Sequence, residues 1–289
     1  MTSDGGPPDF NAELHSRPSI YFSGPALVEH VAFIPLSHQT QGVAEIEQGD
    51  IPTRENRGRT QIEHHTEFTT VTRVTPLSLP LQEWPQEAKF PGEFGLSNNC
   101  QQLISRVSIL VLDAPPQDLS PTLKSLGFAD TAASAIGGGA AQVCSDFRLG
   151  PGGSSRILLF NGELNAYRLG RMVRRLCEIE TYRSMALLGL PEARRVTPVL
   201  RDFDEKLTNL TNRHLNTPAQ EHKQLLEEIS TLSAQVISAT AETRNRFGAT
   251  AAYATIVEER IAELRESHVP GFQRFGVFVA RRFKPAVRT

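Results

Sequence analysis

The sequence predicts an α+β protein: an N-terminal β-rich α+β domain followed by a long helical hairpin or bundle. Runs of β-branched and aromatic residues, separated by prolines and glycines, dominate residues 26–162 and are typical of strands joined by turns. Beyond residue 162, apolar residues recur three and four positions apart, which is typical of amphipathic helices. We therefore divide the chain into an extended arm at 1–25, an α+β domain at 26–162 and a helical stalk or bundle at 163–289.

The first half contains several segments with strand character. The first one could be a strand or a short helix, and we favour the strand because Pro25 and Pro35 bracket it; a long polar loop at 36–58 follows. A proline-rich loop at 76–95 carries Trp84, which we expect to fix the loop in place. The predicted elements are a strand at Ala26–Ile34, one long strand or two paired ones at Arg59–Val74, a buried strand at Ile104–Leu112, a short helix at Leu119–Phe128, and a hairpin formed by Ala140–Phe147 and Arg156–Phe160.

The second half is predicted to form helices separated by short helix-breaking segments. Gly189-Leu-Pro191 ends or bends the first helix, and Pro191 can open the next one. From Leu225 to Thr243 the apolar spacings are 4, 3, 4, 3 and 4, as in a coiled coil or an antiparallel helical hairpin. The predicted apolar faces span Leu169–Ala186, Val199–Leu210, Leu225–Thr243, Tyr253–Leu264 and Phe272–Phe283.

Composition and charge limit the class of protein. With 39% hydrophobic and 21% charged residues the chain has the composition of a globular protein, and it has neither a signal-like N-terminus nor about 20 consecutive apolar residues. Its three widely separated cysteines indicate no disulfide framework and favour a reducing compartment. The two halves differ in sign: residues 1–162 carry 10 basic and 17 acidic residues, a net charge of −7, whereas residues 163–289 carry 20 and 15, a net charge of +5.

Several short sequence motifs along the chain together resemble one family of bacterial membrane-anchored proteins, the domain of unknown function 3422. They are Leu14-His-Ser-Arg-Pro18, His65-Thr-Glu-Phe68, Glu180-Thr-Tyr-Arg-Ser-Met-Ala-Leu-Leu-Gly-Leu-Pro191, Arg246-Phe-Gly-Ala249 with Tyr253, and Glu263-Leu-Arg-Glu266 followed by Val269-Pro-Gly271. The resemblance implies a cytoplasmic α+β domain and a helical stalk at the inner face of the bacterial inner membrane. It also implies a C-terminal pair of transmembrane helices beyond Thr289, so the chain is expected to be either a fragment or a member that has lost its anchor. The resemblance transfers no catalytic residues.

Two groups of residues are candidates for binding metals or anions. His65 and Glu67 would share one face of a strand, but two side chains are fewer than the three or four ligands that zinc takes, so an exposed polar strand is the favoured interpretation. Arg168, Arg171 and Arg175, with Arg174 beside them, fall mostly on one side of a helix and could bind an anion. Pairing with Glu178 or with the acidic first half is the favoured alternative.

Other polar residues have structural explanations. Glu180, Tyr182 and Arg183 lie on a helix that should pack against others, so we expect them to form a paired polar network. Cys144 and Cys177 read as small buried residues. The glycine runs at 137–139 and 150–153 lack the P-loop and dinucleotide patterns and read as turns, and we expect no cofactor. The basic residues near the C-terminus, Arg281, Arg282, Lys284 and Arg288, suit either a solvated helix end or an anionic membrane surface.

These observations favour a non-enzymatic assembly or scaffold protein that forms homo-oligomers through its helical half. Because few aromatic residues accompany the arginines, we expect no nucleic-acid partner. One alternative is an enzyme-like domain that binds a small molecule, an anion or a metal. Another, based on analogy of architecture alone, is the soluble part of a channel resembling the magnesium transporters.

Overall fold

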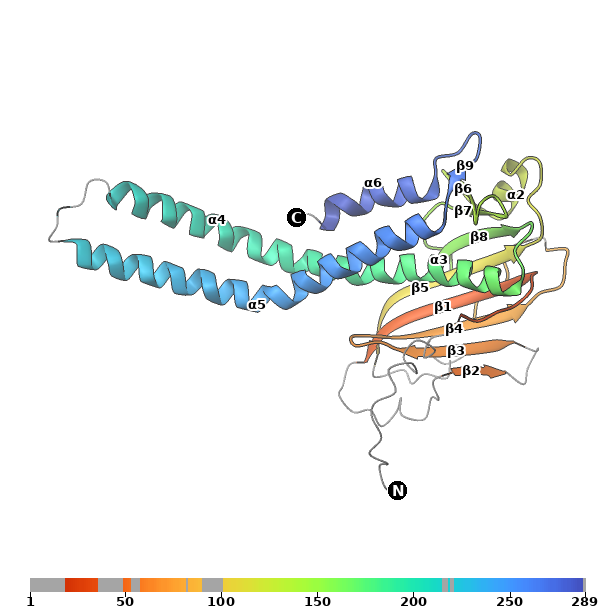
Figure 1. Ribbon diagram of the computed structural model, residues 1–289, viewed down its shortest axis with the longest axis horizontal. Helices are drawn as coiled ribbons and strands as arrows, with labels where there is room; N and C mark the ends of the chain where they lie inside the picture. Colours follow the sequence, from red (N-terminus) through yellow and green to blue (C-terminus); the bar gives the residue numbers. More distant parts are fainter. Residues whose placement is uncertain are drawn as a thin grey trace, which may run out of the picture. The chain divides into compact units, whose positions relative to one another are not determined.

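The computed structural model describes residues 19–35, 49–52, 58–81, 83–89, 101–214, 218 and 221–287. These residues form a large β-sheet and a set of long helices, so the predicted α+β class is confirmed (Figure 1). The contacts divide the chain into two compact units. The first comprises residues 1–181 and 259–279, and the second comprises residues 182–258 and 280–289. The two units are described separately below.

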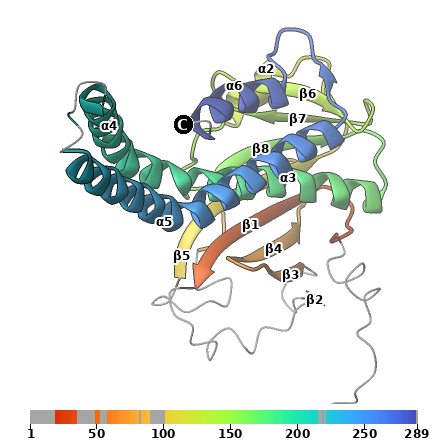
Figure 2. The ribbon, with the colours of Figure 1, turned by 60° about the vertical axis from the view of Figure 1, so that its left-hand side comes forward.

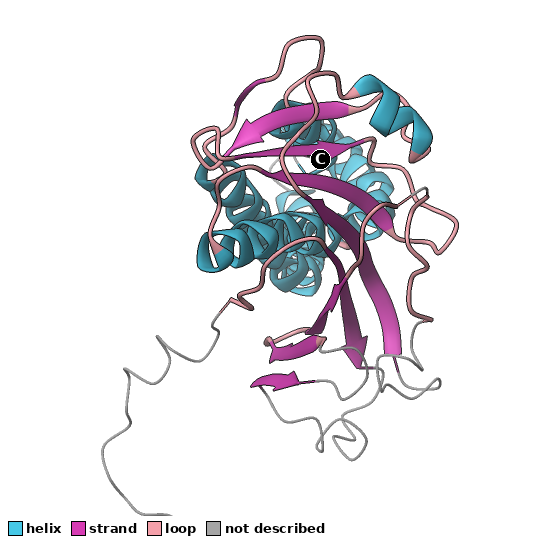
Figure 3. Ribbon diagram, turned by 90° about the vertical axis from the view of Figure 1, so that its right-hand side faces the viewer, coloured by secondary structure: helices cyan, strands magenta, loops and turns pink. Residues whose placement is uncertain are grey.

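The first unit is built on a sheet in the order β2-β3-β4-β1-β5-β8-β7-β6-β9 (Figure 3). Neighbouring strands are antiparallel except β5 and β8, which are parallel. The strands are β1 (Ala26–Pro35), β2 (Gly49–Pro52), β3 (Arg59–His64), β4 (Thr69–Pro76), β5 (Gln101–Leu112), β6 (Ala132–Ile136), β7 (Ala141–Ser145), β8 (Ser155–Asn161) and β9 (Ser267–His268).

Most strand predictions are confirmed, but three strands, β2, β6 and β9, were missed. The segment Arg59–Val74 is the pair of strands β3 and β4, and the expected hairpin is β7 and β8. The sequence analysis missed β6, because its small residues have low strand propensity, although the strand is almost fully buried. It also missed β9, which pairs with β6 and returns the chain to the sheet far beyond residue 162. The loop predicted at 36–58 lies mostly outside the described residues, but the prediction is wrong at 49–52, which form β2 and pair with β3.

Within the first unit, different segments pack against the two faces of the sheet. Helix α3 (Ala166–Leu187) contributes residues 166–181 to one face, where Leu169, Val173 and Leu176 are buried (Figure 2). On the other face, Trp84 and the short helix α2 (Ser120–Ser125) pack over Leu110 and Leu158. The tryptophan therefore anchors its loop as predicted. This burial of both faces positions the polar side chains that lie between the sheet and α3.

The second unit contains an antiparallel pair of helices. The helices of this half are α4 (Gly189–His214), α5 (His222–Glu263) and α6 (Phe275–Val287), and α3, α5 and α6 each contribute residues to both units. Phe203 and Leu210 of α4 pack against Leu225 and Leu232 of α5, and Figure 1 shows the two helices running side by side. The sequence analysis expected two helical segments in the region of α5, but the structure has one continuous helix of 42 residues. Gly248 between them does not interrupt it, because a glycine inside a long helix costs only about 1 kcal/mol.

Candidate functional site

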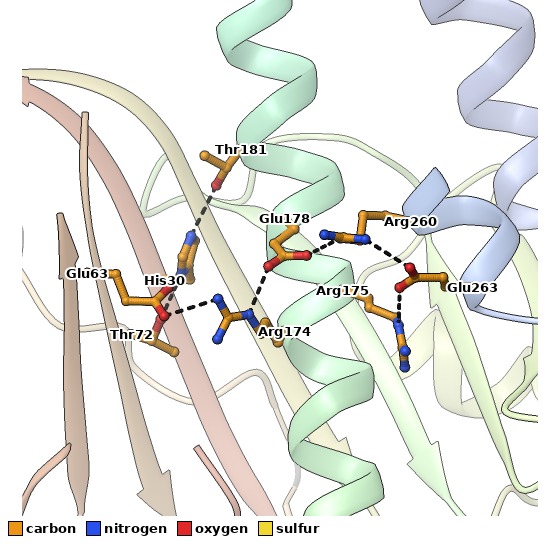
Figure 4. A network of polar contacts seen from close by, with 9 residues as sticks. All are labelled: His30, Glu63, Thr72, Arg174, Arg175, Glu178, Thr181, Arg260 and Glu263. Carbon is orange, nitrogen blue, oxygen red and sulfur yellow. Dashed lines mark hydrogen bonds and ion pairs between the residues drawn. The ribbon is translucent and has the colours of Figure 1, made fainter. Parts of the chain in front are cut away.

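A chain of alternating charges crosses the face of the sheet that α3 covers (Figure 4). Glu63 of β3 accepts from Arg174 at 3.1 Å, and Arg174 also donates to Glu178 at 2.8 Å. Glu178 pairs in turn with Arg260, which donates to Glu263 at 2.9 Å. Glu263 completes the chain by accepting from Arg175 at 2.7 Å. Three carboxylates therefore neutralise three guanidinium groups and join β3, α3 and the end of α5 within the first unit.

His30 lies beside this chain and is buried between β1, β4 and α3. Its Nδ1 is 2.8 Å from the hydroxyl of Thr72, and its Nε2 is 3.0 Å from the hydroxyl of Thr181. Burial lowers the pKa of His30 to about 3, and the positive charges of His65 and Arg174 act in the same direction. The imidazole is therefore neutral at physiological pH, and it joins two strands to a helix.

An open cavity lies next to the end of the charge chain. Its volume is about 310 Å³, and it is lined mainly by arginines of the first turns of α3 and of the segment after α5. The lining includes Arg168, Arg171, Arg175 and Arg265, together with Gly137 of the β6–β7 turn and Glu263. The structure therefore brings together the three arginines that the sequence analysis named as an anion site, and it adds a fourth from 90 residues further along the chain.

On the opposite face of the sheet, a second polar cluster fixes the loop that carries Trp84. The Glu29 carboxylate accepts from the backbone N–H of Ala88 at 2.6 Å, and Arg106 lies 4.0 Å from Glu29 and 3.7 Å from Glu87. Glu87 also accepts from Trp84 Nε1 at 3.2 Å. Burial raises the pKa of Glu29, and the Ala88 hydrogen bond opposes that shift. These contacts are local to the loop and the sheet, so this cluster is structural.

Among the described residues, the candidate metal ligands and the cysteines are not part of any cluster of metal-ligating side chains. His65 and Glu67 lie in the turn between β3 and β4, where the N–H of His65 donates to Phe68, and not on a strand as the sequence analysis placed them. Across the described residues, no three histidine, cysteine, aspartate or glutamate side chains are grouped as metal ligands. Cys144 and Cys177 are buried, and burial raises the pKa of both thiols, that of Cys144 to about 12. A thiolate nucleophile is therefore disfavoured.

The remaining predicted residues lie on α3 and α6. Glu180 is almost fully buried, and the ring of Tyr182 stacks on that of Tyr253 with centroids 5.6 Å apart. The network of Glu180, Tyr182 and Arg183 stays a prediction. Of the basic C-terminal residues, Arg281 and Arg282 are exposed on α6, Lys284 pairs with Glu258 at 3.0 Å, and Arg288 lies outside the described residues.

Comparison with known proteins agrees with the resemblance found in the sequence. The model of a family described as "Protein of unknown function (DUF3422)" matches residues 8–289. The chain belongs to the DUF3422 family. No curated protein and no solved structure matches it. Among the helices of the described part of this DUF3422 chain, none is both long enough and apolar enough to cross a membrane.

Several residues of the site in this DUF3422 protein were not predicted. Glu63, Arg260 and Glu263 were not recognised as partners of the α3 arginines, and His30 read as an ordinary strand residue. Most of the pairs join residues far apart in sequence, as Arg175 and Glu263, which are 88 positions apart, show. There were two local signals: the i, i+4 spacing of Arg174 and Glu178, which the sequence analysis named, and the i, i+3 spacing of Arg260 and Glu263, which it did not.

Proposed function

We propose that this protein is an assembly module that forms homodimers through one face of the α4–α5 hairpin. The observation that carries the proposal is a group of large apolar side chains left exposed on the hairpin within the described structure. They are Leu200 and Leu207 on α4 and Leu226, Ile229, Val236 and Ile237 on α5. Leu226 and Ile237 are 63% and 66% exposed, so the fold of a single chain leaves them in water.

These side chains share one face of the hairpin. Successive helix residues are rotated by about 100°, which places the four exposed residues of α5 in an arc that directly adjoins its buried stripe, Leu225 and Leu232. On the antiparallel helix α4, Leu200 and Leu207 adjoin its buried stripe on the same side of the hairpin. Between Gln224 and Ala241 the only charged residues of α5 are Glu227 and Glu228, and both fall outside the arc.

The opposite face of the hairpin is polar and already paired. Arg213 pairs with Glu228, and Arg195 lies 3.6 Å from Glu242. A shallow groove there is lined mainly by polar side chains, among them Lys206 and Gln235. The hairpin therefore has one face satisfied by its own ion pairs and one face that lacks an apolar partner. Such an arrangement is typical of a half-bundle that completes its core by association.

A second copy of the same hairpin is the partner that fits this face. Twofold symmetry places each apolar residue against the same patch of the other copy, so a face with few charges is complementary to itself. The six side chains expose on the order of 500 Å² of apolar surface, and two copies would bury about 1,000 Å², close to the lower limit for a specific interface. The product would be a four-helix bundle made of two hairpins.

Replacing Ile237 with glutamate is expected to abolish dimer formation at micromolar protein concentrations. The symmetry places two buried carboxylates in the interface for one substitution, which we expect to weaken association about 100-fold or more. Light scattering coupled to size-exclusion chromatography should give twice the chain mass of 31.9 kDa for the wild type and 31.9 kDa for the variant.

The matched control is Gln235→Glu, which adds the same charge to the polar face of the same helix. It should dimerise as the wild type does, and both variants should keep the wild-type circular dichroism because both side chains are exposed. A wild-type mass of 31.9 kDa at every concentration tested would contradict the proposal, as would a loss of dimer in the control alone.

A further inference from the structure

We infer that the cavity lined by Arg168, Arg171, Arg175 and Arg265 binds the phosphate group of a small phosphorylated molecule. All four arginines and the cavity lie in the first unit, so the site does not depend on the hairpin or its association. The volume of about 310 Å³ accommodates one or two phosphate groups with a small substituent.

The acidic side chain in the lining is already engaged. Glu263 accepts from Arg175 at 2.7 Å through one oxygen and from Arg260 at 2.9 Å through the other. The hydrogen bond from Arg175 holds the pKa of Glu263 below its usual range, so the carboxylate stays ionised and paired. The negative charge of Glu263 is therefore paired with Arg175 and Arg260. It does not neutralise the other cations that line the cavity, Arg168, Arg171 and Arg265.

Two guanidinium groups have open hydrogen-bonding capacity. Within the described structure, the side chains of Arg171 and Arg265 make neither a hydrogen bond nor an ion pair, and the side chain of Arg168 makes a single bond, at 3.2 Å to the carbonyl of Gly137. Each guanidinium offers five N–H donors in a planar fork that fits two oxygens of a phosphate. Converging forks of this kind match a dianion with three or more oxygens better than a single carboxylate.

The position of the arginines on α3 also favours an anion. Arg168 lies in the first turn of α3, where the helix dipole gives the backbone a partial positive charge and cations are disfavoured, and Arg171 follows in the second turn. The first turn of α3 contains no acidic residue to offset this effect. A bound phosphate would interact favourably with both the side chains and the helix end.

The backbone of Arg265 supplies an independent observation. Arg265 lies two residues beyond the end of α5 with a φ of 50°, in the left-handed region that glycine usually occupies after a helix. A residue with a Cβ is less stable there than glycine, and such strain tends to persist where the side chain has a function. The N–H of Gly137 donates to Leu264 at 2.8 Å and so fixes this turn against the cavity.

The Arg265→Gly variant separates binding from folding. Glycine suits the left-handed conformation, so the variant should be at least as stable as the wild type, while its affinity for phosphate should fall about tenfold or more because a charge-assisted contact is lost. Inorganic pyrophosphate, titrated calorimetrically into the full chain, is the probe for a free phosphorylated molecule. Sedimentation with vesicles that contain phosphatidic acid is the probe for a lipid headgroup.

A second variant and a control complete the experiment. Arg171→Gln should lose affinity to a similar extent, whereas Arg201→Gln, which removes an exposed charge from α4, should bind as the wild type does. Binding in either assay that Arg265→Gly and Arg171→Gln both weaken supports the inference, and the responding probe identifies the source of the phosphate. Binding in neither assay, or equal binding by the wild type and both variants, overturns it.

Discussion

Replacing Gly170 with alanine is expected to lower the free energy of unfolding of the first unit by about 3 kcal/mol, as overpacking against backbone does at the high end of its range. A Cβ at this position of α3 would lie 2.0 Å from the carbonyl oxygen of Ile20 and 2.9 Å from its carbon. Relief requires the segment at Ile20 to move away from α3. Contacts of Tyr21 with Tyr167 and Arg59 hold that segment in place. Urea denaturation followed by the fluorescence of Trp84, the only tryptophan, measures the change in this unit.

Replacing Gly248 with alanine should have the opposite effect and raise the free energy of unfolding. No atom lies within 4 Å of a Cβ built at Gly248, which is exposed in the interior of α5. Alanine is favoured over glycine there by about 1 kcal/mol, so Gly248→Ala should stabilise the helix, as measured by circular dichroism during denaturation. If Gly170→Ala were also neutral or stabilising, the close packing of Ile20 on α3 would be wrong.

Acid is expected to destabilise the first unit through His30, by about 2 to 3 kcal/mol between pH 6.5 and pH 4.5. The pKa of His30 is lowered to about 3 in the folded protein, whereas an unfolded histidine has its ordinary value of about 6.5. Below pH 6.5 the imidazole of His30 therefore binds a proton in the unfolded chain but not in the folded chain. The free energy of unfolding falls as the pH falls. The loss ends near pH 3, where both states are protonated.

A His30→Gln variant should lose this part of the pH dependence, because glutamine can keep hydrogen bonds to Thr72 or Thr181 without titrating. Glu29 acts in the opposite direction, since burial raises its pKa, but it is present in both proteins and cancels in the comparison. His214→Gln, at an exposed position of α4, should leave the wild-type dependence unchanged. Equal losses of stability in the wild type and His30→Gln, measured by urea denaturation at pH 7 and pH 4.5, would contradict the role of His30.

Only part of the candidate site could be predicted from the sequence. The helical spacing of Arg168, Arg171 and Arg175 grouped them on one helix face, because residues three and four apart are neighbours there, and the same three residues line one cavity. Arg265 could not be added to it, since nothing local to a residue at the end of one helix shows that it faces the start of another. For the same reason, the suggested pairing of the α3 arginines with the acidic first half could not be made specific to Arg174 and Glu63.

Local patterns determined the class and most elements of this protein. The apolar run of β5, the proline brackets of β1 and the stripes of α3, α4 and α5 each follow from periodicities that neighbouring residues set by themselves. Tertiary structure alone decided that β6 is a strand, because the burial of its small residues outweighs their weak propensity. It also decided which charges meet, since ion pairs between residues far apart in the chain depend on how the sheet and helices pack.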